Sequence, residues 1–131
     1  MRKNVFILLV ILISLLTGCG LETETFSELY NKNLGEVTEI VILDGTTGRE
    51  KTIAEKAEVE RFLEDVKHIK FIPNEDQTSV VGYRYRITLF KDQAKTFETD
   101  LREVNNHQYH TEPDMFPIVD DYFMNHGDDK E

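Results

Sequence analysis

The chain contains few of the residues on which covalent catalysis and covalent cross-links depend. Cysteine occurs once among the 131 residues, as Cys19, so no disulfide can form within the chain. Beyond Gly18 the only serines are Ser27 and Ser79, and neither lies in the Gly-x-Ser-x-Gly turn of many hydrolases. We therefore expect a domain held together by packing alone, with little support for covalent hydrolase chemistry.

A hydrophobic run long enough to span a membrane is also missing. The stretch from Val5 to Leu16 is apolar except for Ser14. As a helix it would be about 18 Å long, whereas the hydrocarbon core of a bilayer is about 30 Å thick. Arg2 and Lys3 precede this run, and its length is that of the hydrophobic region of a signal peptide.

The four residues that end this run and follow it are Leu16-Thr17-Gly18-Cys19. They resemble the end of a bacterial lipoprotein signal, which reads Leu-small-Gly/Ala-Cys. The resemblance implies cleavage after Gly18, a diacylglyceryl group on the sulfur of Cys19, and a lipid anchor on the extracytoplasmic face of the cell membrane. Two acyl chains give stable anchoring where one chain is marginal. An ordinary signal peptide, or an uncleaved anchor with an incidental cysteine, is the alternative.

Basic residues are outnumbered, with 15 Lys and Arg against 25 Asp and Glu. Removal of the segment 1–18 takes away Arg2 and Lys3 and no acidic residue, so the remaining chain has 13 basic and 25 acidic side chains, a net charge of −12. The segment 19–131 has the length of one small domain. The charge repels nucleic acids and anionic headgroups, so we expect neither as a partner.

The pattern of apolar residues divides the chain into four parts. We expect a signal peptide at 1–18, a tether at 19–34, a single domain at 35–124 and a disordered acidic tail at 125–131. A helical turn around Phe26–Tyr30 is compatible with the tether. A flexible segment of about a dozen residues has an end-to-end distance of roughly 20 Å, so the domain would stay near the membrane.

The first half of the domain predicts two strands and a helix. Residues 36–43 and 49–53 have strand composition, and the turn 44–48 between them makes a hairpin. This turn lacks the spacing and the Gly-Lys-Ser/Thr ending of a phosphate-binding loop. Val59, Phe62, Leu63, Val66 and Ile69 then fall at helical spacing and form one apolar face. Residues 70–72 read as a further short strand.

The second half predicts an antiparallel hairpin followed by a closing helix. Apolar and polar residues alternate through 81–90, and again through 97–102 after a turn near 92–94. A register that pairs Leu89 with Phe97 sets Ile87 opposite Thr99, Tyr85 opposite Leu101, Thr88 opposite Glu98 and Arg86 opposite Asp100. Residues 104–111 read as a loop or an edge strand. Pro117 suits the first turn of a helix whose apolar face is Ile118, Val119, Tyr122 and Phe123.

These elements predict an α+β domain. We expect an antiparallel sheet made of two N-terminal strands, a helix and an antiparallel meander, with the helices packed on one face.

Two groups of residues have the chemistry of metal ligands. His107, His110, Glu112 and Asp114 lie close together in the sequence, but their spacing is neither that of a known zinc finger nor that of His-Glu-x-x-His, and no thiolate is present. A polar surface loop is the favoured interpretation. In the tail, His126, Asp128, Asp129 and Glu131 could bind a cation loosely. We expect no metal or other cofactor, and His107 and His110 are only weak metal candidates.

Two further groups bear on recognition and on catalysis. Tyr83, Arg84, Tyr85 and Arg86 have the composition of a recognition surface. The favoured alternative places the tyrosines in the core and pairs the arginines with Glu98, Asp100 or Glu103. Asp120 and Asp121 are adjacent on a helix, which keeps their carboxylates off a common face and makes a paired acid/base site improbable.

The segments 42–48 (Ile-Leu-Asp-Gly-Thr-Thr-Gly), 81–90 (Val-Gly-Tyr-Arg-Tyr-Arg-Ile-Thr-Leu-Phe) and 116–123 (Phe-Pro-Ile-Val-Asp-Asp-Tyr-Phe) resemble small lipoproteins of Bacillus and its relatives, in particular the YhfM-like group. That resemblance implies a lipoprotein and supplies no catalytic residue. We therefore expect a non-catalytic envelope lipoprotein that binds a protein or a small ligand. A metal- or ligand-dependent envelope enzyme is one alternative. An inhibitor or immunity-type lipoprotein, with an exposed apolar patch on its sheet, is another.

Overall fold

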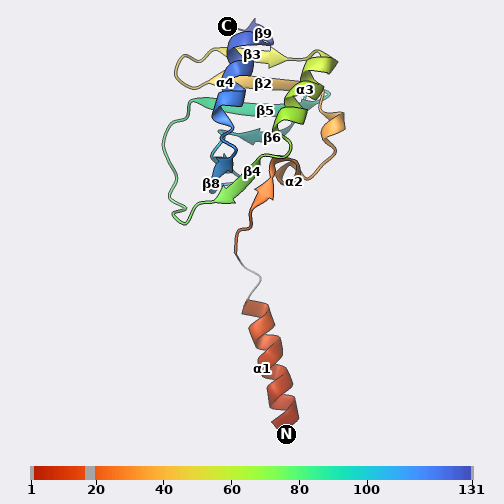
Figure 1. The fold of residues 1–131 in the computed structure, drawn as a ribbon, viewed down its shortest axis with the longest axis vertical. Helices are drawn as coiled ribbons and strands as arrows, with labels where there is room; N and C mark the ends of the chain where they lie inside the picture. The colour runs from red at the N-terminus through yellow and green to blue at the C-terminus, as the bar shows by residue number, and fades with distance from the viewer. Residues whose placement is uncertain (1, 17–19, 131) are drawn as a thin grey trace.

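The computed structural model describes residues 2–16 and 20–130, with the backbone alone described for residues 11–16 and 129–130. Helix α1 (Arg2–Leu16) precedes the folded domain (Figure 1). Its side chains from Val5 to Val10 are each more than half exposed, and the buried core of the described chain begins only at Phe26. Among the described residues, no helix has both the length and the hydropathy that crossing a membrane requires.

From residue 24 onward, short helices and strands form one domain. In chain order they are β1 (Glu24–Thr25), α2 (Phe26–Tyr30), the 3-10 helix η1 (Leu34–Glu36), β2 (Glu39–Asp44), β3 (Glu50–Ile53), α3 (Lys56–Val66), β4 (Lys70–Pro73), β5 (Tyr85–Lys91), β6 (Ala94–Thr99), β7 (Glu103–Val104), β8 (His107–Glu112), α4 (Phe116–Asn125) and β9 (Asp128–Lys130). The described strand pairs are antiparallel. The predicted α+β class with antiparallel strands is confirmed.

The larger sheet has the strand order β6-β5-β2-β3-β9. Ile40 of β2 pairs with Leu89 of β5, and Ile42 pairs with Ile87, so that alternate residues of both strands are buried on one face. The predicted hairpin register is confirmed for three of its five pairs, Leu89 with Phe97, Thr88 with Glu98 and Ile87 with Thr99. The tight turn at Asp92 and Gln93 has positive φ at both positions, as a turn between antiparallel strands requires.

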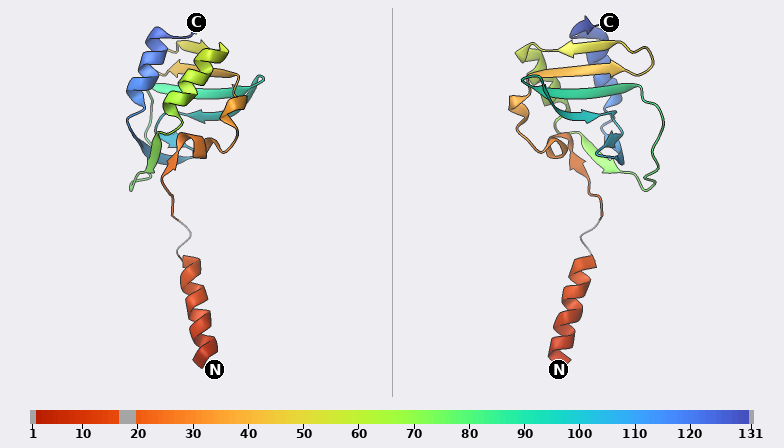
Figure 2. Two further views of the ribbon diagram at one scale, coloured as in Figure 1. Left: turned by 45° about the vertical axis from the view of Figure 1, so that its right-hand side comes forward. Right: turned by 180° about the vertical axis from the view of Figure 1, so that it is seen from behind.

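Helices α3 and α4 cover the buried face of this sheet, whereas the opposite face carries no helix (Figure 2). The apolar face of α3 contributes Phe62 to the core, and α4 contributes Tyr122, whose ring meets that of Phe62 edge-on at 5.0 Å between centroids. Pro117 lies in the first turn of α4, as predicted. The placement of the helices on one face agrees with the sequence prediction.

A smaller sheet, ordered β1-β4-β8-β7, lies beside the larger one. Aromatic rings join the two sheets. Phe26 of α2 lies 6.2 Å from the ring of Phe71 in β4 and 5.4 Å from that of Phe97 in β6, between ring centroids. Tyr30, one turn further along α2, contacts Phe97 at 5.9 Å. The short helix α2 therefore fills the space between the sheets.

The tether expected at 19–34 is wrong from Glu24 onward. Thr25 and Glu28 form a capping box, in which each side chain accepts a hydrogen bond from the other residue's amide, and this starts α2. Phe26 is fully buried and Tyr30 is 4 % exposed. Burial of these two rings outweighs the polar composition that suggested a flexible segment.

The strand expected at 81–90 begins later, at Tyr85. Gly82 has a φ of 85°, which no strand residue adopts, and Val81 is 99 % exposed. At the other end of the hairpin, β6 ends at Thr99. Leu101 has a φ of 75°, so the expected pairs of Tyr85 with Leu101 and of Arg86 with Asp100 do not form.

The expectation of a disordered tail at 125–131 is also wrong for its described part. Asn125 ends α4, and residues 128–130 form β9, which pairs with β3. Gly127 makes the connection possible, because it has a φ of 72° and a Cβ at this position would lie 2.8 Å from the carbonyl oxygen of Thr52.

The segment 104–111, expected as a loop or an edge strand, supplies part of β7 and of β8, and β8 is an interior strand of the smaller sheet.

Candidate functional site

A cleft of about 640 Å³ opens where the two sheets meet the start of α4. We call it the cleft. Its charged and aromatic lining comes from segments that are far apart in the sequence: the start of β5, the turn after β6, strand β8 and the start of α4. The residues that define it are Arg84, Tyr85, Asp100, Arg102, His110 and Asp114.

Tyr85 forms part of the base of the cleft. Its ring is fully buried, and its hydroxyl donates a hydrogen bond to Oδ1 of Asp120 in α4 at 2.5 Å. Burial, followed by this bond to a carboxylate, raises the pKa of Tyr85 above its usual value. The hydroxyl therefore stays protonated at neutral pH and fixes α4 against β5.

Arg84, the residue before Tyr85, reaches Asp44 at the end of β2, with 3.6 Å between Nη2 and Oδ2. Asp44 is buried. Burial works to raise the pKa of Asp44, but the hydrogen bond from the amide of Thr46 and the charge of Arg84 outweigh it, so the pKa lies below its usual value. The side chain of Arg84 is 45 % exposed, which leaves much of its guanidinium accessible.

Both carboxylates of the cleft are held by backbone amides. Oδ1 of Asp100 accepts from the amides of Arg102 at 3.0 Å and Glu103 at 2.6 Å, in the turn that follows β6. Oδ1 of Asp114 accepts from the amide of Phe116 at the start of α4, at 3.0 Å. These Asx-type turns fix the direction of each carboxylate without using its second oxygen.

Arg102 connects the cleft to the long loop at 74–84. Its Nη2 donates to the carbonyl oxygen of Gly82 at 2.5 Å. Further along this loop, Nε2 of Gln77 donates to the carbonyl oxygen of Gln108, and Oε1 of Gln77 accepts from the amide of Gln108, at 2.9 Å each. The loop is therefore attached to β8 and to the turn after β6, and it borders the cleft.

The structure separates the two weak metal candidates. His110 lines the cleft and its Nδ1 lies 2.8 Å from Oδ1 of Asn74. His107 and His110 are separated by an odd number of positions on β8, which directs the two side chains to opposite faces of the strand. Asp114 shares the cleft with His110. Among the described residues, no group of three or more His, Cys, Asp or Glu side chains could hold a metal ion.

The residues Tyr83 to Arg86, which the sequence suggested as one recognition surface, lie at two different places in the structure. Arg84 and Tyr85 line the cleft, whereas Arg86 stacks on Tyr83, with 4.2 Å from its Cζ to the ring centroid. Arg86 also faces Glu98 at 3.7 Å, one of the partners expected from the sequence. Tyr85 is a core residue. The partner of Arg84, Asp44, is one that the sequence did not reveal.

The remaining sequence candidates lie apart from the cleft. Asp121 accepts from Asn125 at 2.8 Å, away from the bond between Asp120 and Tyr85, so this acidic pair has two separate partners. The ring of His126 stacks on Tyr122 at 4.8 Å and approaches Glu58 and Asp121. Gly18 and Cys19, the predicted cleavage and lipidation positions, lie outside the described residues, as do Glu131 and the side chain of Asp129.

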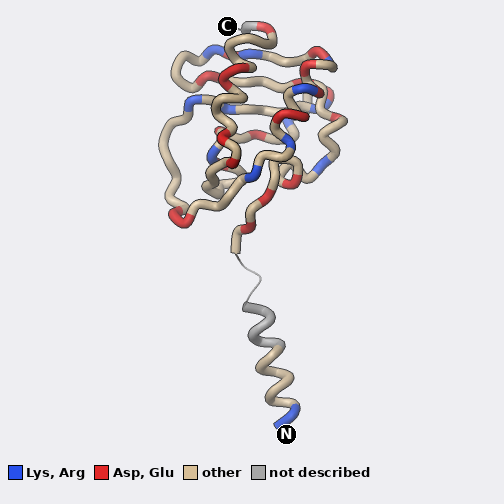
Figure 3. Tube along the Cα trace, in the orientation of Figure 1, with Lys and Arg blue, Asp and Glu red and all other residues tan. Residues whose placement is uncertain are grey.

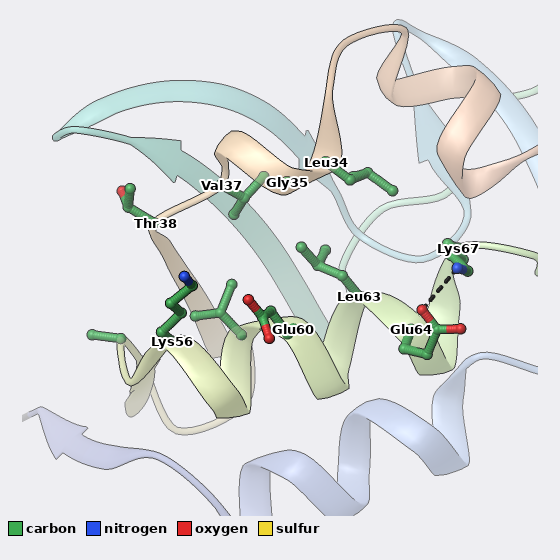
Figure 4. A pocket seen from close by; sticks show the side chains of 11 residues that line it. Leu34, Gly35, Val37, Thr38, Lys56, Glu60, Leu63, Glu64 and Lys67 are labelled. Atoms are coloured by element: carbon green, nitrogen blue, oxygen red, sulfur yellow. Dashed lines mark ion pairs between the residues drawn. The ribbon is translucent and has the colours of Figure 1, made fainter.

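A second hollow, which we call the groove, lies between α3 and residues 34–38 and encloses about 610 Å³ (Figure 4). Leu63 points into it, Leu34 lies at its edge, and the buried side chains of Val37 and Val59 add to its apolar lining. Charged residues stand at its rim, where Lys67 pairs with Glu64 at 2.7 Å.

No known family model matches the chain, and comparisons with curated proteins and with solved structures found no match. The arrangement of residues described above therefore carries the functional argument.

Sequence reasoning selected Arg84, Tyr85, His110 and Asp114 without recognising that they share one cleft. It missed Arg102, Asn74 and Phe116 as lining residues. The turn-forming sequence Asp100-Leu101-Arg102 was a signal for a break in the strand, because Asp favours turns in which its side chain caps the backbone.

Proposed function

We propose that this protein is a lipid-anchored extracytoplasmic lipoprotein of the cell membrane whose folded domain is a non-catalytic binding module. The cleft carries the binding part of the proposal. It gathers two arginines, two aspartates, a histidine and aromatic side chains in a volume within the range of small-ligand sites, about 300–1,000 Å³. The sequence Leu16-Thr17-Gly18-Cys19 after an apolar run supports the anchor.

The short distance between the anchor and the domain fits this role. Because β1 begins at Glu24, only the segment 19–23 separates the proposed lipid from the fold. At most about 3.6 Å per residue, this spacer spans about 18 Å. The domain would therefore work next to the membrane, and a membrane partner or a small ligand of the envelope is the expected binding partner. The net negative charge, distributed over the whole domain in Figure 3, continues to argue against nucleic acid.

The structure gives less support to the other functions. An enzyme that used His107 and His110 together would need both at one place, and β8 separates them. An inhibitor with an exposed apolar patch on its sheet would use the face without helices. There, Val41, Leu43 and Phe90 are only partly exposed, and the charged Arg86 and Glu98 stand on the same sheet.

The anchor is tested by replacing Cys19 with alanine. We expect the wild-type protein in the membrane fraction, labelled by radioactive palmitate and released by detergent, and the Cys19→Ala variant unlabelled and free of the membrane. An unlabelled wild-type protein would contradict the anchor.

Binding is tested in intact envelopes with a photo-crosslinking amino acid at Phe116, which lines the cleft and is 40 % exposed. The matched control places the same amino acid at Met124, which is 65 % exposed on the same helix and is not a lining residue of the cleft. We expect an adduct from position 116 alone. Equal yields at both positions, or none at either, would contradict a binding role for the cleft.

A further inference from the structure

The cleft differs from the rest of the domain in its balance of charge. The chain as a whole has 25 acidic and 15 basic residues, whereas the cleft is lined by two arginines and two aspartates. A purely anionic ligand would meet the two carboxylates, and a purely cationic ligand would meet the two guanidinium groups. The lining therefore fits a ligand that carries both signs.

The two arginines of the cleft retain donors for a carboxylate. A guanidinium has five N–H donors. Arg102 uses one of them on the carbonyl oxygen of Gly82. Arg84 lies 3.6 Å from Asp44 and also against the ring of Tyr85, with 5.1 Å from its Cζ to the ring centroid, so part of its guanidinium is occupied and the rest stays open to a ligand. Arginine binds carboxylates in a bidentate manner, which suits the end of an amino acid or peptide.

The two aspartates of the cleft retain acceptors for an ammonium group. The hydrogen bonds of Asp100 and Asp114 described above all use Oδ1. Their Oδ2 atoms can therefore accept from a ligand while the backbone amides keep both carboxylates in place. Charge-assisted bonds of this kind are stronger than those between neutral groups.

The walls between the charged groups are apolar. Tyr85, Tyr109 and Leu101 are buried, and Phe116 is partly exposed at the start of α4. Burial and the charge of Glu24 raise the pKa of Tyr109, which keeps its hydroxyl neutral. An apolar side chain of a ligand would therefore meet the exposed ring of Phe116, and the volume of about 640 Å³ has room for a short peptide.

We infer that the cleft binds a zwitterionic ligand with an apolar body, of the class of free amino acids and short peptides, with its carboxylate bound by Arg84 and Arg102 and its ammonium group bound by Asp100 and Asp114. This inference rests on the proposed binding function and names the ligand class of the same site.

The test is calorimetric titration of the full chain in detergent micelles with the dipeptide Leu-Phe. Two comparison ligands each lack one charge: N-acetyl-Leu-Phe has no ammonium group and Leu-Phe-amide has no carboxylate. We expect each to bind about tenfold more weakly or worse than Leu-Phe, because each loses a charge-assisted interaction. Equal affinity for the three ligands, or no binding of any of them, would overturn the zwitterion assignment.

Binding measurements on variants show which residues of the cleft meet the carboxylate of the ligand and which meet its ammonium group. Arg102→Gln should weaken binding of Leu-Phe about tenfold and leave binding of Leu-Phe-amide unchanged. Asp114→Asn, which keeps an oxygen for the amide of Phe116, should weaken Leu-Phe and leave N-acetyl-Leu-Phe unchanged. Lys95→Gln and Asp121→Asn, which remove charges outside the cleft, are the matched controls and should bind as wild type. The reverse pattern, or equal losses for all ligands, would overturn the assigned orientation.

Failure of this inference is distinguishable from failure of the proposed function. If the dipeptides do not bind but the crosslinker at position 116 still gives an adduct, the cleft binds a ligand of another class. If position 116 gives no adduct and the dipeptides do not bind, both are overturned.

Discussion

The cleft and the groove have similar volumes, about 640 and 610 Å³, but their linings are arranged in opposite ways. In the groove, the interior is made of core residues such as Val59 and Leu63, and charged residues stand at the rim. In the cleft, charged groups line the interior, and each is held by a backbone or side-chain partner. The interior of the groove is therefore part of the core, whereas the cleft adds charged residues that lie outside the core to a buried base.

This difference predicts different costs of substitution in the two hollows. Truncation of a groove residue removes buried apolar area and should reduce stability. Replacement of Arg102 in the cleft should change ligand binding and leave stability nearly intact, because partly exposed charges that pair with no buried group contribute little to folding.

The largest effect is expected for Phe26→Ala. The cleft is built from both sheets, and Phe26 contacts Phe71 of one and Phe97 of the other. Loss of this fully buried ring should cost about 3–5 kcal/mol of unfolding free energy in urea, followed by circular dichroism. Phe90→Ala, on the open face of the sheet, is the control and should cost less. A cost below about 1 kcal/mol for Phe26→Ala would show that α2 does not hold the sheets together.

Leu63→Ala tests the groove. Leu63 is 6 % exposed and borders an existing hollow, so we expect a loss of about 2 kcal/mol, at the lower end of the range for buried leucines. Urea denaturation measures it, with Lys67→Ala at the rim as the matched control. Equal stability of Leu63→Ala and the wild type would mean that the groove residues are not part of the core.

Stability should fall at alkaline pH through Tyr85 and Tyr122. Burial first, and then hydrogen bonds to Asp120 and to Asp65 at 2.5 and 2.6 Å, raise both pKa values above the usual 10.0. A pKa raised in the folded state gives stabilisation that is complete below about pH 10 and is lost as the pH rises toward the folded pKa.

The pair Tyr85→Phe and Tyr122→Phe checks this dependence. Each should lose about 1 kcal/mol at neutral pH and show a flatter decline of the urea midpoint above about pH 10. Tyr83→Phe, which leaves both of these hydrogen bonds in place, is the control. In the variant that carries both substitutions, the urea midpoint should decline less with pH than in the wild type. A decline as steep as that of the wild type would assign the alkaline instability to other groups.

The smallest effect on stability is expected in the cleft itself. Arg102→Gln should change the unfolding free energy by no more than about 0.5 kcal/mol. It should nevertheless speed proteolysis within the loop at 74–84, because the bond from Arg102 to Gly82 is lost. Lys95→Gln is the control for both measurements. A large loss of stability in Arg102→Gln would contradict the view that, unlike the groove, the charged lining of the cleft contributes little to folding.

The sequence was most informative where one segment carries its own pattern. The stripe from Val59 to Val66 predicted α3, and the alternation around Leu89 and Phe97 predicted the register of the hairpin. Phe26 falls in the predicted tether because its partners, Phe71 and Phe97, are distant along the chain, and a local pattern does not reveal such contacts.

The cleft was harder to predict for the same reason. Arg84 and its partner Asp44 lie far apart in the sequence and meet only because Asp44 pairs with Tyr85 across β2 and β5. Arg102 lines the cleft because the chain turns at Leu101, whose positive φ interrupts the expected strand. The sequence shows which residues have binding chemistry, but it does not show that they lie together, because that depends on tertiary structure.

The early start of β1 at Glu24 affects how the protein would meet its partners. With so short a spacer to the proposed lipid at Cys19, encounters with other membrane proteins would take place in a thin layer at the bilayer surface, in two dimensions. Short linkers produce effective concentrations in the millimolar range. A contact of only modest intrinsic affinity would then be occupied on the membrane and would be lost once the domain is released into solution.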